Sequence, residues 1–331
     1  MLKALMISML VLALSAAGLA AYTLWQANTI EARYPPAGIV TRIDGQKIHF
    51  TDQHPTGKAQ ATLLLIHGAS GNEADMRVPL AKQLLARDYR VISIDRPGMG
   101  WSERNGGPDS NSPAGQARII RAALQKHGVK SVIAVVHSLA GAIGLQLALD
   151  HDDFVSGIVL ISPVTHPWPG GIAAYYSIAA SDPGRLFNYT LALPLGQMLL
   201  QSGVESVFAP QTPPPGYAQR TGLPLILRPW TFRANARDVA GLYDFVSSQW
   251  PRYGQISIPT AIIAGDADTI VLTNVHARSS ARQLPGATLT ILPGTGHTPH
   301  WTHTAAVLAE IERVRHRVAI TLPANTPISS R

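Results

Sequence analysis

The chain has no cysteine among its 331 residues. This absence excludes disulfide bonds, thiolate metal sites and a thiol nucleophile, although it leaves the cellular compartment open. Acidic residues are also fewer than basic ones, 20 against 27, which gives a net charge of +7. The basic residues are scattered, with no dense run and no interleaved aromatic platform, so the charge does not predict nucleic-acid binding. Attraction to anionic lipid headgroups explains it as well.

Charge is missing altogether from residues 4–28, which follow Lys3 and are mostly apolar. About 20 such residues span the hydrocarbon core of a bilayer at 1.5 Å per residue. Tyr22 and Trp25 stand near the end of the run, where an interfacial aromatic belt is expected. We therefore predict a single-pass N-terminal membrane anchor that contacts membrane lipid.

A cleaved signal peptide is the alternative interpretation of this run, with residues 18–20 as a small-residue cleavage site. The apolar region of a signal peptide is usually only about 7–15 residues long. The longer run here favours the uncleaved anchor. Lys3 and the free amine favour a cytoplasmic N-terminus, which would place the rest of the chain on the extracytoplasmic side, although Arg33 weakens this bias.

Short apolar runs alternate with helix-length amphipathic segments along most of the remaining chain. The runs occupy residues 61–66, 90–94, 131–136, 259–264 and 287–292. This alternation predicts β-α-β units and a parallel sheet that is buried on both faces. In such sheets the loops at the carboxyl ends of the strands carry the chemistry.

Each of these runs ends in a conspicuous loop motif. The motifs are HGASGN from His67, DRPGMGWSE from Asp95, VVHSLAG around Ser138, GDADTIV from Gly265, and PGTGH ending in His297. A serine between a strand and a helix is typical of a nucleophile elbow, where the sharp turn exposes the hydroxyl. The usual elbow pattern is G-x-S-x-G, and here Val136 and Ala140 replace the two glycines.

Together these motifs resemble the α/β-hydrolase family, over about residues 38–317, and the branch with an HG oxyanion loop and a helical cap. The resemblance implies an α/β fold with a mostly parallel, doubly wound sheet and an inserted cap, here preceded by a transmembrane helix. The expected organisation is a membrane anchor or signal peptide at 1–30, a first part of the core at 31–162, a helical cap at 163–252, a second part of the core at 253–320, and a disordered tail at 321–331.

The resemblance also implies the roles of individual residues. Ser138 would be the nucleophile, Asp268 the acid and His297 the base, in the chain order Ser, Asp, His that is expected of this fold. The backbone N–H groups of Ala69 and Leu139 would form the oxyanion hole. A serine hydroxyl is a weak nucleophile until an imidazole takes its proton, and a carboxylate must orient that imidazole.

Neighbouring residues offer alternatives for some roles. Asp266 competes with Asp268, but the pattern G-x-x-D selects Asp268 and leaves Asp266 to hydrogen-bond within the turn. His300 and His303 follow His297 at a spacing of three, yet no carboxylate motif accompanies them, so we expect no metal site.

Three further histidines are open to interpretation. His67 is expected to shape its loop rather than transfer protons. His137 is expected to pack away from the substrate. His166 would line the substrate pocket or belong to the cap hinge.

The resemblance therefore implies a serine hydrolase that cleaves a hydrophobic carboxylic ester and needs no cofactor. The partner would be a small hydrophobic acyl substrate. Amidase, thioesterase, acyltransferase, carbon–carbon hydrolase and perhydrolase chemistry remain open on the same site, and so does a non-catalytic binding or scaffold protein. The sequence does not determine the oligomeric state.

Overall fold

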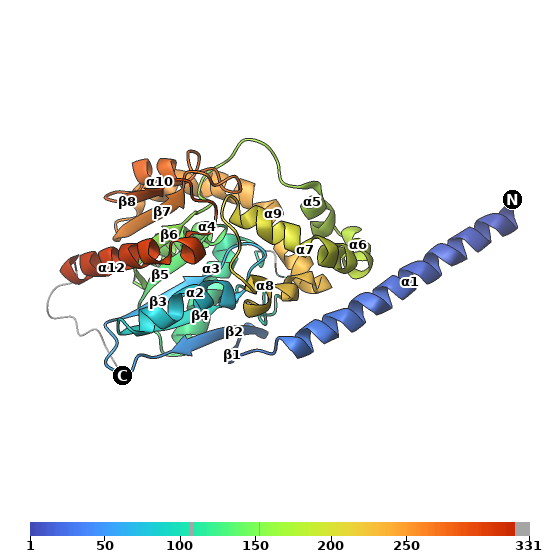
Figure 1. Ribbon diagram of the computed structural model, residues 1–331, viewed down its shortest axis with the longest axis horizontal. Coiled ribbons are helices and arrows are strands. Elements are labelled where there is room, and N and C mark those ends of the chain that lie inside the picture. Colours follow the sequence, from blue (N-terminus) through green and yellow to red (C-terminus); the bar gives the residue numbers. More distant parts are fainter. Residues whose placement is uncertain (106, 108, 152, 322–331) are drawn as a thin grey trace.

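The computed structural model describes residues 1–105, 107, 109–151 and 153–321. Figure 1 shows a central sheet with helices on both faces, and a long N-terminal helix that projects away from it. The tail expected at residues 321–331 lies almost wholly outside the described residues.

In the described part of the chain, eight strands form one sheet in the order β1-β2-β4-β3-β5-β6-β7-β8. They are β1 (Ile39–Ile43), β2 (Gln46–Gln53), β3 (Ala61–Ile66), β4 (Tyr89–Ile94), β5 (Val132–His137), β6 (Val155–Ile161), β7 (Thr260–Gly265) and β8 (Thr288–Leu292). The β1–β2 and β2–β4 pairs are antiparallel, and the pairs from β4 to β8 are parallel. This confirms the predicted mostly parallel sheet.

The strand register brings the candidate loops to one edge of the sheet. Ile66, the last residue of β3, pairs with Ile94 of β4 on one side and with Val136 of β5 on the other. The carboxyl ends of these three strands are therefore level, and the loops that follow them lie together.

Helices cover both faces of the sheet because the strands are apolar on both faces. Side chains of β3 alternate between two buried clusters: Leu63 and Leu65 face one, and Leu64 and Ile66 face the other. The covering helices are α2 (Glu73–Leu85), α3 (Pro113–Lys126), α4 (Ala140–Asp150), α10 (Ala277–Gln283), α11 (Pro299–Thr302) and α12 (Thr304–Thr321).

A helical insertion separates β6 from β7, where the resemblance implied a cap. It contains α5 (Ala174–Ala180), α6 (Gly184–Thr190), α7 (Ala192–Phe208), α8 (Tyr217–Arg220), η1 (Leu223–Leu227), α9 (Pro229–Gln249) and η2 (Trp250–Gln255). The proline-rich run at 209–216 is not helical, as its prolines predict.

The first helix, α1 (Leu2–Arg33), is the one helix in the described residues that is long and apolar enough to cross a membrane. Its apolar window has a mean hydropathy of 2.2 and is 0% buried. The last turns are different, because Thr23, Ala27 and Ile30 are buried against the cap. By length and composition, this N-terminal helix fits an anchor or a signal sequence.

The crowded junction between β5 and α4 explains how the elbow accommodates Val136. A Cβ atom placed on Gly144 would lie 3.0 Å from each Val136 methyl carbon and 2.9 Å from Ile158 Cδ1. The isopropyl group thus occupies the space that a side chain at position 144 would need. We infer that Gly144 compensates for the missing elbow glycine.

This compensation predicts a specific coupling. Gly144→Ala should destabilise the fold by about 1–3 kcal/mol through overpacking, and Val136→Gly should also destabilise it while leaving activity within about tenfold. Because Val136→Gly removes two of the three methyl carbons that an alanine at position 144 would meet, the double variant should be more stable than the sum of the two effects predicts. Urea denaturation measures this coupling.

Val135→Gly is the matched control, because Val135 belongs to the cluster on the other face of the sheet. Its effect on the free energy of unfolding should simply add to that of Gly144→Ala. The compensation would be contradicted if Gly144→Ala gave the same coupling energy with Val135→Gly as with Val136→Gly.

Candidate active site

Ser138 ends β5 with its backbone in the left-handed region, at φ 55°. Its N–H donates to Ile161 O at 3.0 Å, and its carbonyl accepts from Gly141 N at 2.8 Å and Val164 N at 2.9 Å. Such a conformation costs on the order of 1–3 kcal/mol for a non-glycine residue, and it persists only where the surroundings impose it. Strain of this kind clusters at active sites.

Asp268 and His297 form a buried pair. His297 Nδ1 lies 2.7 Å from Asp268 Oδ2, while Asp268 Oδ1 accepts from the backbone N–H groups of Ile270 at 2.8 Å and Val271 at 2.9 Å. The two backbone donors fix the carboxylate, which in turn fixes the ring. A carboxylate that holds the Nδ1–H leaves Nε2 available as a general base.

The competing carboxylate, Asp266, has a different environment. It is exposed, and its Oδ1 accepts from Gly294 N at 2.6 Å. Gly294 belongs to the loop that precedes His297, so Asp266 braces that loop from outside. The structure thus brings Asp268, and not Asp266, onto the imidazole.

The loop after β3 packs directly against the elbow. A Cβ atom on Gly68 would lie 2.9 Å from Ser138 Cβ, so only glycine allows this approach. Ala69 is the next residue, and Leu139 is the N-cap residue of α4. The first N–H groups of a helix have no partner within the helix, which makes this the place where an oxyanion could be bound.

His67 supports the same loop in its neutral form. Burial, with the neighbouring Arg96 charge, lowers the pKa of His67 to about 4. Its Nε2 accepts from Arg96 N at 3.1 Å, and Nδ1 can therefore donate to Gly68 O at 2.8 Å. This geometry agrees with a residue that shapes the loop.

Arg96 links the oxyanion loop to the cap. It is fully buried and donates to the carbonyls of His67 and Gly68, both at 3.1 Å, and to Asp238 Oδ2 of α9 at 2.6 Å. Burial lowers the pKa of Arg96, although Asp238 opposes this shift. A buried charge of this kind needs its partner, and loss of one partner typically costs 3–5 kcal/mol.

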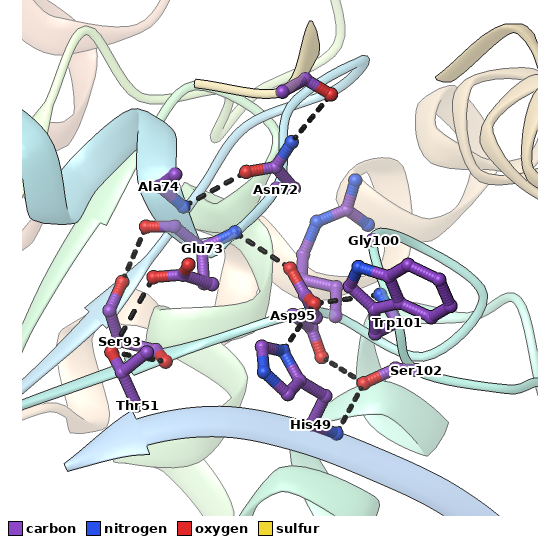
Figure 2. A network of polar contacts seen from close by, with 12 residues as sticks. His49, Thr51, Asn72, Glu73, Ala74, Ser93, Asp95, Gly100, Trp101 and Ser102 are labelled. Carbon is purple, nitrogen blue, oxygen red and sulfur yellow. Dashed lines mark hydrogen bonds and ion pairs between the residues drawn. The ribbon is translucent and has the colours of Figure 1, made fainter. Parts of the chain in front are cut away.

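Asp95 organises the loop after β4 (Figure 2). Its carboxylate accepts from Glu73 N at 2.7 Å and Trp101 N at 2.8 Å, and it lies 2.7 Å from His49 Nδ1. A Cβ atom on Gly100 would fall 2.2 Å from the Asp95 carboxylate, which explains the glycine there. Both Asp95 and Arg96 thus brace loops.

Asn72 connects the same network to the cap through hydrogen bonds. Its Oδ1 caps α2 by accepting from Ala74 N at 2.9 Å, and its Nδ2 donates to Thr221 O at 2.8 Å (Figure 2).

Gln211 was not identified from the sequence, although it holds the His297 loop. This cap residue donates to Gly294 O at 2.6 Å and accepts from Gly296 N at 2.9 Å. The only sequence signal was its place in the proline-rich run, and that run does not reveal a contact 85 residues away.

A second buried group lies behind the triad candidates. His137 Nε2 donates to His297 O at 3.0 Å, and its ring lies 4.4 Å from that of His300. Asp75 Oδ2 lies 3.6 Å from His300 Nε2, and Asp75 Oδ1 accepts from Tyr217 OH at 2.8 Å. Burial opposes ionisation, but His300, His137 and the Tyr217 hydrogen bond together hold the pKa of Asp75 well below its usual range.

Asp75, His137 and His300 also form a candidate metal-binding group. One ligand atom from each of Asp75, His137 and His300 lies within 4.8 Å of the others, so this group could hold an ion. Two imidazoles and a carboxylate suit a divalent transition metal. His303 is not part of the group: its Nδ1 lies 3.0 Å from Thr302 Oγ1.

His166 lies where the chain enters the cap. Its Nδ1 is 2.8 Å from Thr165 Oγ1 and its Nε2 is 2.9 Å from Gln283 Oε1. His276, which the sequence analysis overlooked, accepts from Thr165 N at 3.2 Å and His166 N at 3.3 Å. Protein groups thus surround His166 at the hinge, and a role in the substrate pocket stays a prediction.

The candidate site is closed to solvent. Ser138 is 7% exposed and His297 is 3% exposed. Two hollows of about 430 and 730 Å³ are lined by cap, core-loop and α1 residues, and neither is lined by Ser138 or His297.

Comparison with known proteins agrees with this architecture. A model of the α/β hydrolase fold matches residues 61–304. The chain is 29% identical to an uncharacterized protein of Mycobacterium tuberculosis, over 76% of this chain and 74% of that one. It is 25% identical to a 2-hydroxy-6-oxononadienedioate/2-hydroxy-6-oxononatrienedioate hydrolase of Cupriavidus pinatubonensis, over 81% of this chain and 91% of that one.

Solved structures share the fold. An esterase from Exiguobacterium antarcticum superimposes with a TM-score of 0.65 at 20% identity, covering 84% of this chain and 100% of the other. A membrane phospholipase A gives a TM-score of 0.62 at 20% identity, covering 95% and 99%. The fold and the loop geometry define a hydrolase-type α/β protein. The chain belongs to the α/β hydrolase fold family.

The different environments of Asp268 and Asp266 predict different effects of substitution. Asp268→Asn should lower kcat on the order of 10⁴-fold, because the amide no longer fixes the required imidazole tautomer. Asp266→Asn is the matched control and should mainly change thermal stability through its contact with Gly294. Steady-state ester hydrolysis by both variants measures the difference, and the reverse ranking would reassign the acid.

Proposed function

We propose that the protein is a membrane-associated serine hydrolase that cleaves a hydrophobic carboxylic ester through an acyl-enzyme. One observation carries the proposal: the Asp268–His297 pair, joined at 2.7 Å, stands at the same sheet edge as a serine held in the left-handed conformation. Membership of the α/β hydrolase fold family supports the reaction class.

The proposed reaction uses each of these residues in turn. His297 Nε2 takes the proton of Ser138 Oγ as the oxygen attacks the ester carbonyl, and the N–H groups of Ala69 and Leu139 stabilise the oxyanion. His297 then protonates the leaving alcohol, and Ser138 carries the acyl group. Water, deprotonated by His297, releases the acid and restores the hydroxyl. Loss of one oxyanion donor would cost roughly 3–4 kcal/mol.

Three features favour a hydrophobic ester among the possible substrates. The cap is apolar, α1 is a candidate anchor, and solved structures with this fold include an esterase and a membrane phospholipase A. Within the fold, epoxide hydrolases and haloalkane dehalogenases normally use an aspartate nucleophile, so Ser138 argues against both. The named hydrolase of Cupriavidus pinatubonensis keeps carbon–carbon bond cleavage among the alternatives, beside amidase, thioesterase, acyltransferase and perhydrolase chemistry.

A fluorophosphonate probe tests the nucleophile. The parent protein should become labelled, and Ser138→Ala should abolish labelling, because Oγ is the reacting atom. Ser162→Ala is the matched control, since Ser162 ends the neighbouring strand with φ 42°. Labelling that persists in Ser138→Ala would assign the nucleophile to another residue, and an unlabelled parent would favour a non-catalytic scaffold.

The same proposal treats α1 as an uncleaved anchor. The full-length protein should resist alkaline carbonate extraction, because residues 4–28 carry no charge. Deletion of residues 1–21, which keeps the buried Thr23, Ala27 and Ile30, should release an active soluble enzyme. Recovery of a mature chain that begins near Ala21 would show a signal peptide instead.

A further inference from the structure

Three cap helices leave an apolar face uncovered. The cap face consists of exposed apolar side chains on α5, α6 and α7: Ile178, Leu186, Leu191, Leu195, Met198 and Leu199. Met198 is 80% exposed, and Leu186 is 64% exposed. Leu195, Met198 and Leu199 on α7 follow Leu191, the N-cap residue of that helix, by four, seven and eight residues, so these four side chains form one side of a helix.

The opposite side of α7 is packed inside the cap. Ala192 and Leu193 are buried, and a Cβ atom on Gly196 would lie 2.4 Å from Leu227 Cδ2. The helix is therefore fixed against η1, and it cannot rotate to hide its apolar side. Exposed apolar patches of this kind mark interaction sites.

The charge around the cap face suits an anionic surface. Residues 184–204 contain one charged residue, Arg185, and the first acidic residue after them is Glu205. Basic residues near a membrane surface each contribute about 1 kcal/mol of attraction to anionic lipid. Nothing acidic on α6 or the first turns of α7 would oppose contact with lipid headgroups.

The candidate anchor contacts the same helices. Tyr22 OH donates to Gln197 Oε1 at 3.3 Å, and Thr23 Oγ1 donates to Thr190 O at 3.3 Å. Gln197 neighbours Met198, so the cap face begins where α1 meets the cap. The roughly 20 residues of α1 before Tyr22 would cover about 30 Å, the thickness of the hydrocarbon core.

Side-chain contacts fix the joint between α1 and the cap, which is the region where the last turns of α1 pack on the cap helices. Glu31 forms an ion pair with the buried Arg228 at 2.8 Å, and Arg228 stacks over the Trp101 ring at 5.3 Å. Figure 1 shows α6 beside the middle of α1, with α12 on the far side of the core. If α1 crosses a bilayer, this joint sets the cap at the bilayer surface.

We propose that the cap face docks on the lipid bilayer that α1 crosses. Amphipathic helices of this type bury their apolar side about 5–10 Å into the boundary between headgroups and acyl chains. The consequence for substrate rests on the proposed function: a hydrophobic ester would enter beneath the cap from the bilayer rather than from water.

The absence of cysteine allows a site-specific test in the full-length chain. Met198→Cys and the control Ile320→Cys, at a position 72% exposed on α12, are each labelled with the fluorophore NBD. The proteins are reconstituted in vesicles of phosphatidylcholine and phosphatidylglycerol. Lipids that carry a doxyl quencher should reduce the emission at position 198 at least twofold and leave the emission at position 320 unchanged.

Two outcomes would overturn the docking. In the first, iodide in the water quenches the emission at position 198 as strongly as the emission at position 320. This result would place the cap face in solvent. Emission shielded from both quenchers would show that a second protein copy covers the face. The measurement needs no catalysis and works equally in Ser138→Ala, so failure of the proposed hydrolysis would not affect it.

A kinetic comparison tests the substrate route. Met198→Glu should lower hydrolysis of a long-chain ester in vesicles about tenfold, because the added charge lifts the cap face from the lipid. Hydrolysis of p-nitrophenyl acetate should be unchanged, since Met198 is remote from the triad candidates in the sequence and lies on the outer side of α7. Ile320→Glu is the control. Equal loss on both substrates would contradict entry from the bilayer.

Discussion

The left-handed turn at Ser138 is the constraint on which the rest of the site depends. A non-glycine residue at φ 55° is unfavourable by itself, and three backbone hydrogen bonds to β6, α4 and the segment after β6 impose it. The turn directs the chain into α4, whose first N–H groups have no partner within the helix. Close packing follows from it, because Gly68 and Gly144 must both lack a side chain beside the turn.

The cap is bound to each of the loops around this turn by polar contacts. Asp238 of α9 holds Arg96 and thereby the oxyanion loop, Thr221 accepts from Asn72, and Gln211 bridges the loop that carries His297. Tyr217 adds a hydrogen bond to Asp75 beneath the triad candidates. Movement of the cap would therefore change the loops that orient the reacting groups.

Patterns that are local in sequence predicted much of this structure. Apolar runs and their loop motifs predicted the mostly parallel sheet, the inserted helices and the loop that pairs Asp268 with His297. The sequence did not predict the role of Gln211 or the grouping of Asp75 with His137 and His300. Each acts on a partner that is distant in the chain or on another element, and its residue type alone gives no signal. Compensation at the elbow in particular needed the distance between Val136 and Gly144.

Pre-steady-state hydrolysis of a p-nitrophenyl ester tests the central claim most directly, that Ser138 becomes acylated. The account predicts a burst of about one p-nitrophenol per active enzyme before steady turnover, together with an acyl adduct on the peptide that contains Ser138, detected by mass spectrometry after acid quench. Turnover with no burst and no adduct, or an adduct on another residue, would contradict it.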